Sequence, residues 1–178
     1  TRRSSGLVDV ISSNGWLTLA LLAMEVSQMV TQGMWERDSV LLQLPHFTKE
    51  LAQKCQENPG KSIETVFDLV EMEDDERREL LQMSESQLLD IARFCNRFPN
   101  IDLAYDVHDR DNVRAGENIK VHVTLERDLE GRTEIGPVDA PRYPQVKEEG
   151  WWLVVGDPKT DQLLAIKTVT FQRKSTVR

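Results

Sequence analysis

Between Ser84 and Val107 the sequence reads SESQLLDIARFCNRFPNIDLAYDV, and the spacing of its hydrophobic residues changes inside this segment. Before Pro99 they recur every three or four residues, as on one face of an α-helix, at Leu88, Ile91, Ala92 and Cys95. After Pro99 they alternate with polar residues, as in a half-buried β-strand, at Ile101, Leu103, Tyr105 and Val107. Because proline cannot continue a helix, the segment predicts a helical part that ends near residue 100 and a β part that follows it.

Upstream of this boundary the pattern is helical. A long helix is predicted after the N-cap candidates at 12–15, with a hydrophobic stripe at Leu19, Leu22, Val26, Met29 and Val30. Trp16, Leu17, Leu21 and Met24 widen this stripe, so we expect the helix to be apolar around much of its circumference and buried among other helices. Short helices are predicted over 38–44, over 49–56 capped by Thr48, over 63–70 capped by Ser62, over 75–82 capped by Asp74, and after a capping box at 84–87. We therefore expect the end of a helical bundle at 1–35 and a helix-loop-helix domain at 36–100.

Downstream, strands are predicted over 101–107, 119–125, 151–155 and 163–171, with a fifth candidate at 134–137. Turn-separated strands of this length suggest an immunoglobulin-like β-sandwich at 101–178, although such a sandwich needs about seven strands. The last predicted strand lies near the end of the chain and no methionine precedes Thr1, so we expect a truncated sandwich and a piece of a longer protein. Trp151 and Trp152 are neighbours in a strand, so one must face the core, and the other is either covered or is an anchor for a partner.

The composition excludes several classes of protein. The 178 residues carry a net charge of −8, and residues 36–100 contain 14 acidic and 8 basic side chains, which argues against binding duplex nucleic acid through bulk charge. The two cysteines are too few for a disulfide framework, so a reducing compartment is expected. The longest apolar run, 16–24, is about half the length of a membrane span, and no signal peptide is visible.

No catalytic motif is found. Phosphate-binding loops, dinucleotide-binding glycine motifs and a nucleophilic-serine elbow are missing from the sequence. His46, His108 and His122 lie in separate contexts that do not have the spacing of metal ligands. We therefore expect no catalytic, cofactor-binding or metal-binding residue in this chain.

Two groups of residues remain as binding candidates. Candidates for contact with a protein partner are Glu73, Asp74, Asp75, Arg142 and Tyr143. Candidates for contact with RNA phosphates are Arg77, Arg78, Arg93 and Arg97, although each is equally placed to pair with a nearby carboxylate. The turn at 72–75 is acidic and has no glycine, which argues against phosphate binding by backbone amides there.

Five segments resemble the Sec63 homology module. They are the helix from Gly15 to Trp35, LPHF at 44–47, VFDL at 66–69, ARFCNRFPNI at 92–101 and EEGWWLVVGD at 148–157. Within that family the last two look most like the modules of the C-terminal helicase cassette of large spliceosomal U5 RNA helicases. The resemblance implies a helical bundle, a helix-loop-helix and an immunoglobulin-like sandwich, in that order. It also implies that ATP and magnesium are bound by other parts of the parent helicase.

The resemblance favours a non-catalytic module of a nuclear splicing helicase that serves as a docking and scaffold element for spliceosomal proteins. An alternative is an accessory module that contacts RNA and helps the helicase to grip a single strand. A third hypothesis, a membrane-translocation relative at the endoplasmic reticulum, is disfavoured because the motifs match the splicing branch and no membrane anchor is visible.

Overall fold

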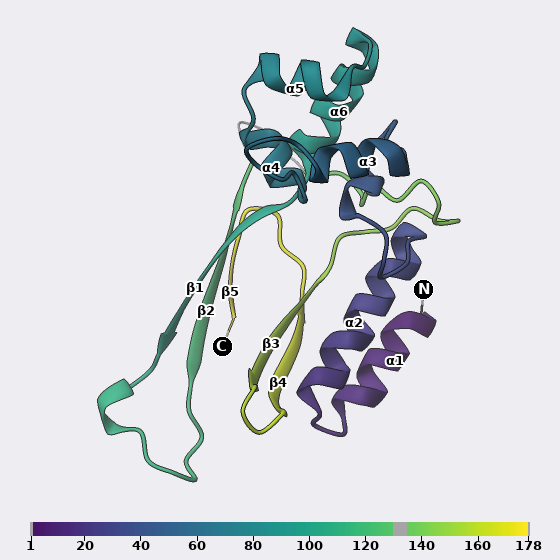
Figure 1. The fold of residues 1–178 in the computed structure, drawn as a ribbon. Coiled ribbons are helices and arrows are strands. Elements are labelled where there is room, and N and C mark those ends of the chain that lie inside the picture. Colours follow the sequence, from purple (N-terminus) through teal and green to yellow (C-terminus); the bar gives the residue numbers. More distant parts are fainter. Residues whose placement is uncertain (1, 130–134, 178) are drawn as a thin grey trace. The chain divides into compact units, whose positions relative to one another are not determined.

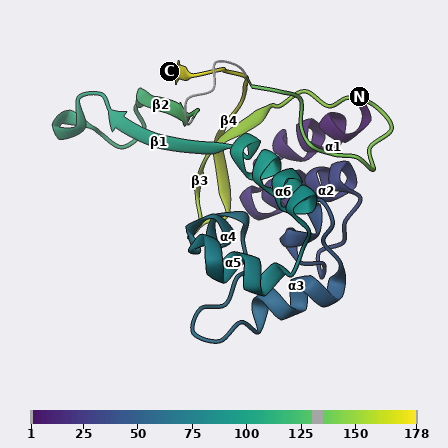
Figure 2. The same ribbon diagram turned by 90° about the horizontal axis from the view of Figure 1, so that it is seen from above.

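The structure is a computed structural model that describes residues 2–129 and 135–177 (Figure 1). In these residues six α-helices precede the first β-strand, and five strands form two small antiparallel sheets, one ordered β1-β2-β5 and the other β3-β4. The predicted order, helices first and strands second, is confirmed. In both views β1 lies beside β2, and β3 lies beside β4 (Figure 2).

The chain folds into two compact units, and each unit is made of two segments that are separated in the sequence. The helix–hairpin unit comprises Thr1–Cys95 and Pro137–Val169, and the three-strand unit comprises Asn96–Gly136 and Thr170–Arg178. The hairpin of β3 (Trp151–Asp157) and β4 (Gln162–Val169) therefore belongs to the same unit as the helices. The packing of all strands into one sandwich stays a prediction.

The first two helices, α1 (Arg2–Ser12) and α2 (Leu17–Gln32), lie side by side. The helix predicted from the hydrophobic stripe is thus present, but none of the cap candidates at 12–15 caps it. Trp16 occupies the N-cap position and its side chain makes no capping hydrogen bond. The cap comes from Asp161, whose Oδ1 accepts hydrogen bonds from the backbone N of Thr18 at 2.8 Å and from its Oγ1 at 2.6 Å.

The hairpin packs on the same two helices through apolar side chains. Val8, Ala23 and Met24 are buried, and Trp152, Val154 and Ile166 of the hairpin pack against them. Trp152 is therefore the inward member of the tryptophan pair, whereas Trp151 is 36% exposed. At the other end of the hairpin, Leu163 N donates to the carbonyl oxygen of Gly15 at 2.8 Å, so backbone contacts also tie β4 to the start of α2.

The buried face of α2 differs from the prediction. The residues predicted to be buried, Leu19, Leu22, Val26 and Val30, are 41–60% exposed in this structure. The buried residues are Leu17 and Met24, which belong to the widened stripe, and Ala20, Ala23 and Ser27, which do not. Ala23 and Met24 belong to the cluster against which the hairpin packs. Ala20, Ala23 and Ser27 have small side chains, and a pattern based on hydrophobicity alone does not select residues by size.

Four short helices and one 3₁₀ turn complete the helical part: η1 (Val40–Gln43), α3 (Lys49–Gln56), α4 (Val66–Glu71), α5 (Asp74–Leu81) and α6 (Glu85–Arg97). Two predicted caps are confirmed. Thr48 Oγ1 accepts from Leu51 N at 3.2 Å, and at the start of α6 Ser84 N donates to Gln87 Oε1 at 3.0 Å.

Two other caps were predicted wrongly. The cap of α4 is Thr65 and not Ser62, because Asp68, three residues after Thr65, completes a capping box with it. The Ser62 hydroxyl instead donates to Glu64 Oε1 at 3.1 Å. Asp74 is already the first residue of α5, and Glu73 occupies the N-cap position.

The three-strand unit contains β1 (Asn100–Val107), the 3₁₀ turn η2 (Arg110–Asn112), β2 (Val121–Asp128) and β5 (Lys174–Val177). The fifth strand of the chain was predicted at 134–137, which is the wrong place. Residues 135–137 are not in a strand, and Glu134 lies outside the described residues. Instead β5 pairs with β2, with Val177 opposite Val123. The prediction missed β5 because its four residues contain a single large apolar side chain, Val177.

Candidate functional site

The acidic partner candidates lie at the turn between α4 and α5. Glu73, Asp74 and Asp75 are exposed, and Asp74 Oδ1 accepts a hydrogen bond from Arg77 Nη1 at 2.9 Å. Carboxylates at the first turn of a helix are stabilised by the partial positive charge of its N-terminus. Their position therefore satisfies a structural need and also leaves negative charge on the surface.

The guanidinium of Arg77 binds backbone carbonyl groups next to the same turn. Its Nε donates to the carbonyl oxygen of Leu69 at 2.9 Å, and its Nη2 donates to the carbonyl oxygens of Val70 at 2.9 Å and Met72 at 2.6 Å. These are carbonyls at the C-terminal end of α4, which have no partner inside the helix. The guanidinium therefore closes α4 and fixes the start of α5.

The other predicted arginines lie apart from it. Arg78 pairs with Glu85 at the start of α6, and Arg93 Nη1 lies 3.8 Å from Asp90 Oδ1, with 70% of the Arg93 side chain exposed. Arg97 is the last residue of α6 and belongs to the three-strand unit. The four arginines therefore do not form one cluster within the helix–hairpin unit.

Arg142 and Tyr143 lie in the segment before β3. Arg142 Nη1 donates to the carbonyl oxygen of Gly33, just after α2, at 3.0 Å. Lys147 Nζ lies 5.7 Å from the centre of the Tyr143 ring, a cation–π distance. These two partner candidates thus lie in a different part of the helix–hairpin unit from α5.

A concave surface, the acidic hollow, lies between α3, the α3–α4 loop and α5. It has a volume of about 1040 Å³. Six carboxylates line it, from Glu50, Glu57, Asp68, Glu71, Glu76 and Glu79. Two lysines, Lys54 and Lys61, line it as well. The acidic candidates predicted from the sequence, Glu73, Asp74 and Asp75, are not among the lining carboxylates. The acidic excess of residues 36–100 was the available signal for the carboxylates that line the hollow.

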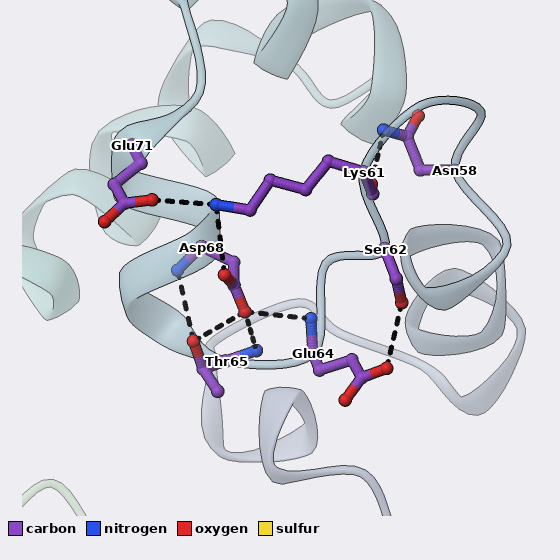
Figure 3. Close-up of polar contacts among 7 residues, drawn as sticks. All are labelled: Asn58, Lys61, Ser62, Glu64, Thr65, Asp68 and Glu71. Atoms are coloured by element: carbon purple, nitrogen blue, oxygen red, sulfur yellow. Dashed lines mark hydrogen bonds and ion pairs between the residues drawn. The ribbon is translucent and has the colours of Figure 1, made fainter.

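Both lysines are already engaged with the protein. Lys54 Nζ donates to the carbonyl oxygen of Leu80 at 2.7 Å. Lys61 Nζ lies 2.7 Å from Glu71 Oε2 and 3.2 Å from Asp68 Oδ1 (Figure 3). Since the lysines neutralise only part of the lining charge, the hollow presents a negative surface that suits lysine or arginine side chains and repels phosphate.

Asp68 is the centre of the network at one side of the hollow. Its Oδ2 accepts hydrogen bonds from Thr65 Oγ1 at 2.7 Å, from Thr65 N at 2.9 Å and from Glu64 N at 3.3 Å (Figure 3). The Thr65 hydroxyl, with Lys61 and the two amides, lowers the pKa of Asp68 to about 2. The carboxylate is therefore ionised at neutral pH and holds the start of α4 in place.

The histidines offer no metal site in the described part of the chain. His46 Nε2 lies 2.8 Å from Asp90 Oδ2, and the rings of His108 and His122 stack with their centres 6.2 Å apart. Among residues 2–129 and 135–177, no group of three or more histidine, cysteine, aspartate or glutamate side chains is arranged to hold a metal ion. Nor does any helix in these ranges have the length and hydropathy needed to cross a bilayer.

Helices come before strands in the described residues, which is the order implied by the family resemblance of the motifs at 44–47, 66–69, 92–101 and 148–157. The model of the Sec63 Brl domain matches residues 2–178. The chain belongs to the Sec63 Brl domain family. The predicted resemblance is thereby confirmed.

The relatives of this chain are much longer proteins. It is 74% identical over all 178 residues to the DExH-box ATP-dependent RNA helicase DExH12 of Arabidopsis thaliana. Over 171 residues, or 96% of the chain, it is 55% identical to the U5 small nuclear ribonucleoprotein 200 kDa helicase of Homo sapiens. The activating signal cointegrator 1 complex subunit 3-like protein of Dictyostelium discoideum is 42% identical. The chain spans 8% of the length of each of these three proteins.

Proposed function

We propose that this chain is a non-catalytic module of an ATP-dependent RNA helicase of the U5 ribonucleoprotein. We further propose that it serves as a docking and scaffold element for spliceosomal proteins in the nucleus. The observation that carries the proposal is the 55–74% identity to helicases of that description over nearly the whole chain. The parent helicase would bind ATP and magnesium outside this chain, since no phosphate-binding motif occurs in its sequence.

Within this module we propose the division that the family resemblance implies. Residues 1–35 end a helical bundle, residues 36–100 form a helix-loop-helix domain, and residues 101–178 contribute to an immunoglobulin-like sandwich. Such a sandwich is built from antiparallel strands, and each of the two sheets of the described residues is antiparallel. Alternating apolar residues such as Val123 and Leu125 of β2, which are buried, support this assignment.

The acidic hollow is the docking surface that we propose for basic segments of partner proteins. Glu76 and Glu79 are exposed on α5, and Glu73, Asp74 and Asp75 extend the negative surface along the same helix. Charge complementarity of this kind raises association rates and excludes partners of the wrong sign. Arg142 and Tyr143 are proposed as a separate, minor contact, because they lie in the segment before β3.

Contact with RNA is the second candidate function. It is favoured by the RNA helicases among the relatives and by the exposed guanidinium of Arg93. Arg78 and Arg97 are proposed as further contacts with RNA. Arg77 would act through the shape of the turn, since three carbonyl groups of the chain bind it. The negative surface of the acidic hollow weighs against this candidate because it repels the phosphate backbone.

The two candidates are separated by titrating the full chain with fluorescent single-stranded and duplex RNA at increasing salt. Docking predicts weak RNA affinity that is unchanged in the Arg78→Ala/Arg93→Ala double variant. RNA contact predicts tight binding that falls steeply with salt and is lost in that variant. The matched control is Lys159→Ala/Lys167→Ala in the β3–β4 hairpin, which removes the same charge elsewhere. Tight binding lost only in the arginine variant would overturn the docking proposal.

A further inference from the structure

A second concave surface, the tryptophan groove, lies on the helix–hairpin unit away from α5. Its volume is about 550 Å³, within the range of sites that bind small molecules or peptide side chains. The last two turns of α2, the segment 34–43 and the segment 147–152 line it. Its apolar lining consists of Met29, Met34, Val40, Val138, Trp151 and Trp152.

The walls of the groove are held together by backbone and side-chain hydrogen bonds. Gln32 Nε2 donates to the carbonyl oxygen of Asp139 at 3.1 Å, and Arg142 Nη1 donates to that of Gly33 at 3.0 Å. Val138 N donates to the carbonyl oxygen of Lys147 at 2.8 Å and closes the segment on itself. Because these bonds fix the segment before β3 against the end of α2, a ligand would not have to order it on binding.

Trp151 supplies an aromatic surface that is positioned before any ligand arrives. It is the outward member of the tryptophan pair, and its Nε1 donates to Glu149 Oε1 at 2.5 Å. A rigid, half-exposed indole is a typical anchor of protein interfaces. Met29 and Met34, which line the same groove, are flexible and polarizable, so they adapt to apolar side chains of different shapes.

The charged residues of the groove decide what kind of ligand fits it. Five carboxylates line it, from Asp9, Glu25, Glu36, Glu148 and Glu149. Among the described lining residues Lys147 supplies the single positive charge. An RNA segment or an acidic peptide would place negative charge against these carboxylates, whereas lysine and arginine side chains would pair with them and stack on the indole of Trp151.

We propose that the tryptophan groove binds a linear segment of a partner protein in which a large apolar or aromatic residue is flanked by lysine or arginine. The apolar residue enters between the methionines and Trp151, and the basic residues pair with the carboxylates at the rim. This proposal rests on the proposed docking function and adds to it a second site with a different chemistry, because the acidic hollow has no aromatic anchor among its lining residues.

The proposal is tested by selecting from a library of random short peptides displayed on phage, with the immobilised full chain as the target. Selected peptides should be enriched in an aliphatic or aromatic residue next to lysine or arginine. Their affinity, measured by fluorescence anisotropy, should fall roughly tenfold or more in Trp151→Ala, as for other aromatic anchors at interfaces. A second variant, Glu36→Lys/Glu148→Lys, changes exposed charges of the rim and keeps the test valid if Trp151→Ala does not fold.

The control variant is Glu76→Lys/Glu79→Lys, which makes the same change of charge in the acidic hollow. Peptides that bind the tryptophan groove keep their affinity for this variant. Selection of acidic peptides, absence of any enriched sequence, or enriched peptides whose affinity is unchanged in both groove variants would overturn the groove proposal. If enriched basic peptides lose affinity only in the control variant, the docking function survives and the groove proposal fails.

Discussion

Asp161 caps α2 by binding Thr18, which lies 143 residues before it in the sequence. Its Oδ1 accepts hydrogen bonds from the backbone N and the Oγ1 of Thr18, in the first turn of α2. The same hydrogen bonds from Thr18 lower the pKa of Asp161. Because Asp161 lies in the turn between β3 and β4, a residue of the hairpin turn caps the helix on which the hairpin packs.

Removing this cap is predicted to destabilise the chain. Asp161 has a φ of 55°, a conformation in which alanine would be strained, so Asp161→Gly is the cleaner substitution. We expect Asp161→Gly to lower the urea midpoint of unfolding because the amide of Thr18 loses its acceptor. Asp161→Asn keeps an acceptor and tolerates the same φ, so its midpoint should lie between those of Asp161→Gly and the unsubstituted chain. Equal midpoints for all three proteins would show that the cap contributes no stability.

A side chain at position 156 is predicted to separate the hairpin from α2. A Cβ at Gly156 would lie 2.5 Å from Leu17 Cδ1 and 3.0 Å from the carbonyl oxygen of Gln162. Gly156→Ala should therefore cost about 1–3 kcal/mol of unfolding free energy, the usual cost of overpacking. Gly6→Ala is the matched control, since nothing lies within 4 Å of that Cβ in α1. Thermal or urea unfolding of both variants measures the difference, and similar stabilities would contradict the predicted close approach.

Arg77 is predicted to matter for stability and not for RNA affinity. Lysine keeps the charge but cannot reproduce the three-way guanidinium contacts to the end of α4, so Arg77→Lys should cost about 2 kcal/mol. Arg93→Lys, at a side chain that is 70% exposed, should cost little. Urea unfolding provides the measurement. If Arg77→Lys is as stable as Arg93→Lys while RNA affinity falls, then Arg77 contacts RNA and its structural assignment is wrong.

Acid should weaken the start of α4 through Asp68. Its pKa is lowered from 3.8 to about 2, so the folded state holds its proton less tightly than the unfolded chain does. The stabilising contribution is therefore complete above pH 4 and is lost as the pH falls through 2. Asp68→Asn should be less stable than the unsubstituted chain at pH 7, and the two stabilities should converge toward pH 2. A difference that stays constant over this range would exclude ionisation of Asp68 as the cause.

Local signals predicted much of this fold. Thr48 and Ser84 cap the helices that follow them, and the change of period at Pro99 places the start of β1 within a residue of its position in the structure. These features depend on residues close together in the sequence, where capping and periodicity rules apply.

Features that depend on distant residues were not predicted. The cap of α2 comes from Asp161, and the buried face of α2 includes Ala23 and Met24, against which the distant hairpin packs. The same limit applied to the candidate sites. The acidic cluster before α5 was visible in the sequence, but the acidic hollow also needs Glu50 and Glu57 of the neighbouring helical segment. The tryptophan groove joins residues near 30 with residues near 150, which periodicity cannot pair.

The most direct measurement is capture of U5 ribonucleoprotein proteins from nuclear extract by the tagged full chain, with and without ribonuclease treatment. Docking through an acidic protein surface predicts capture that survives ribonuclease and falls in Glu76→Lys/Glu79→Lys, but not in Arg78→Ala/Arg93→Ala. Capture that disappears with ribonuclease and is lost in the arginine variant would contradict it and would show that the chain reaches its partners through RNA.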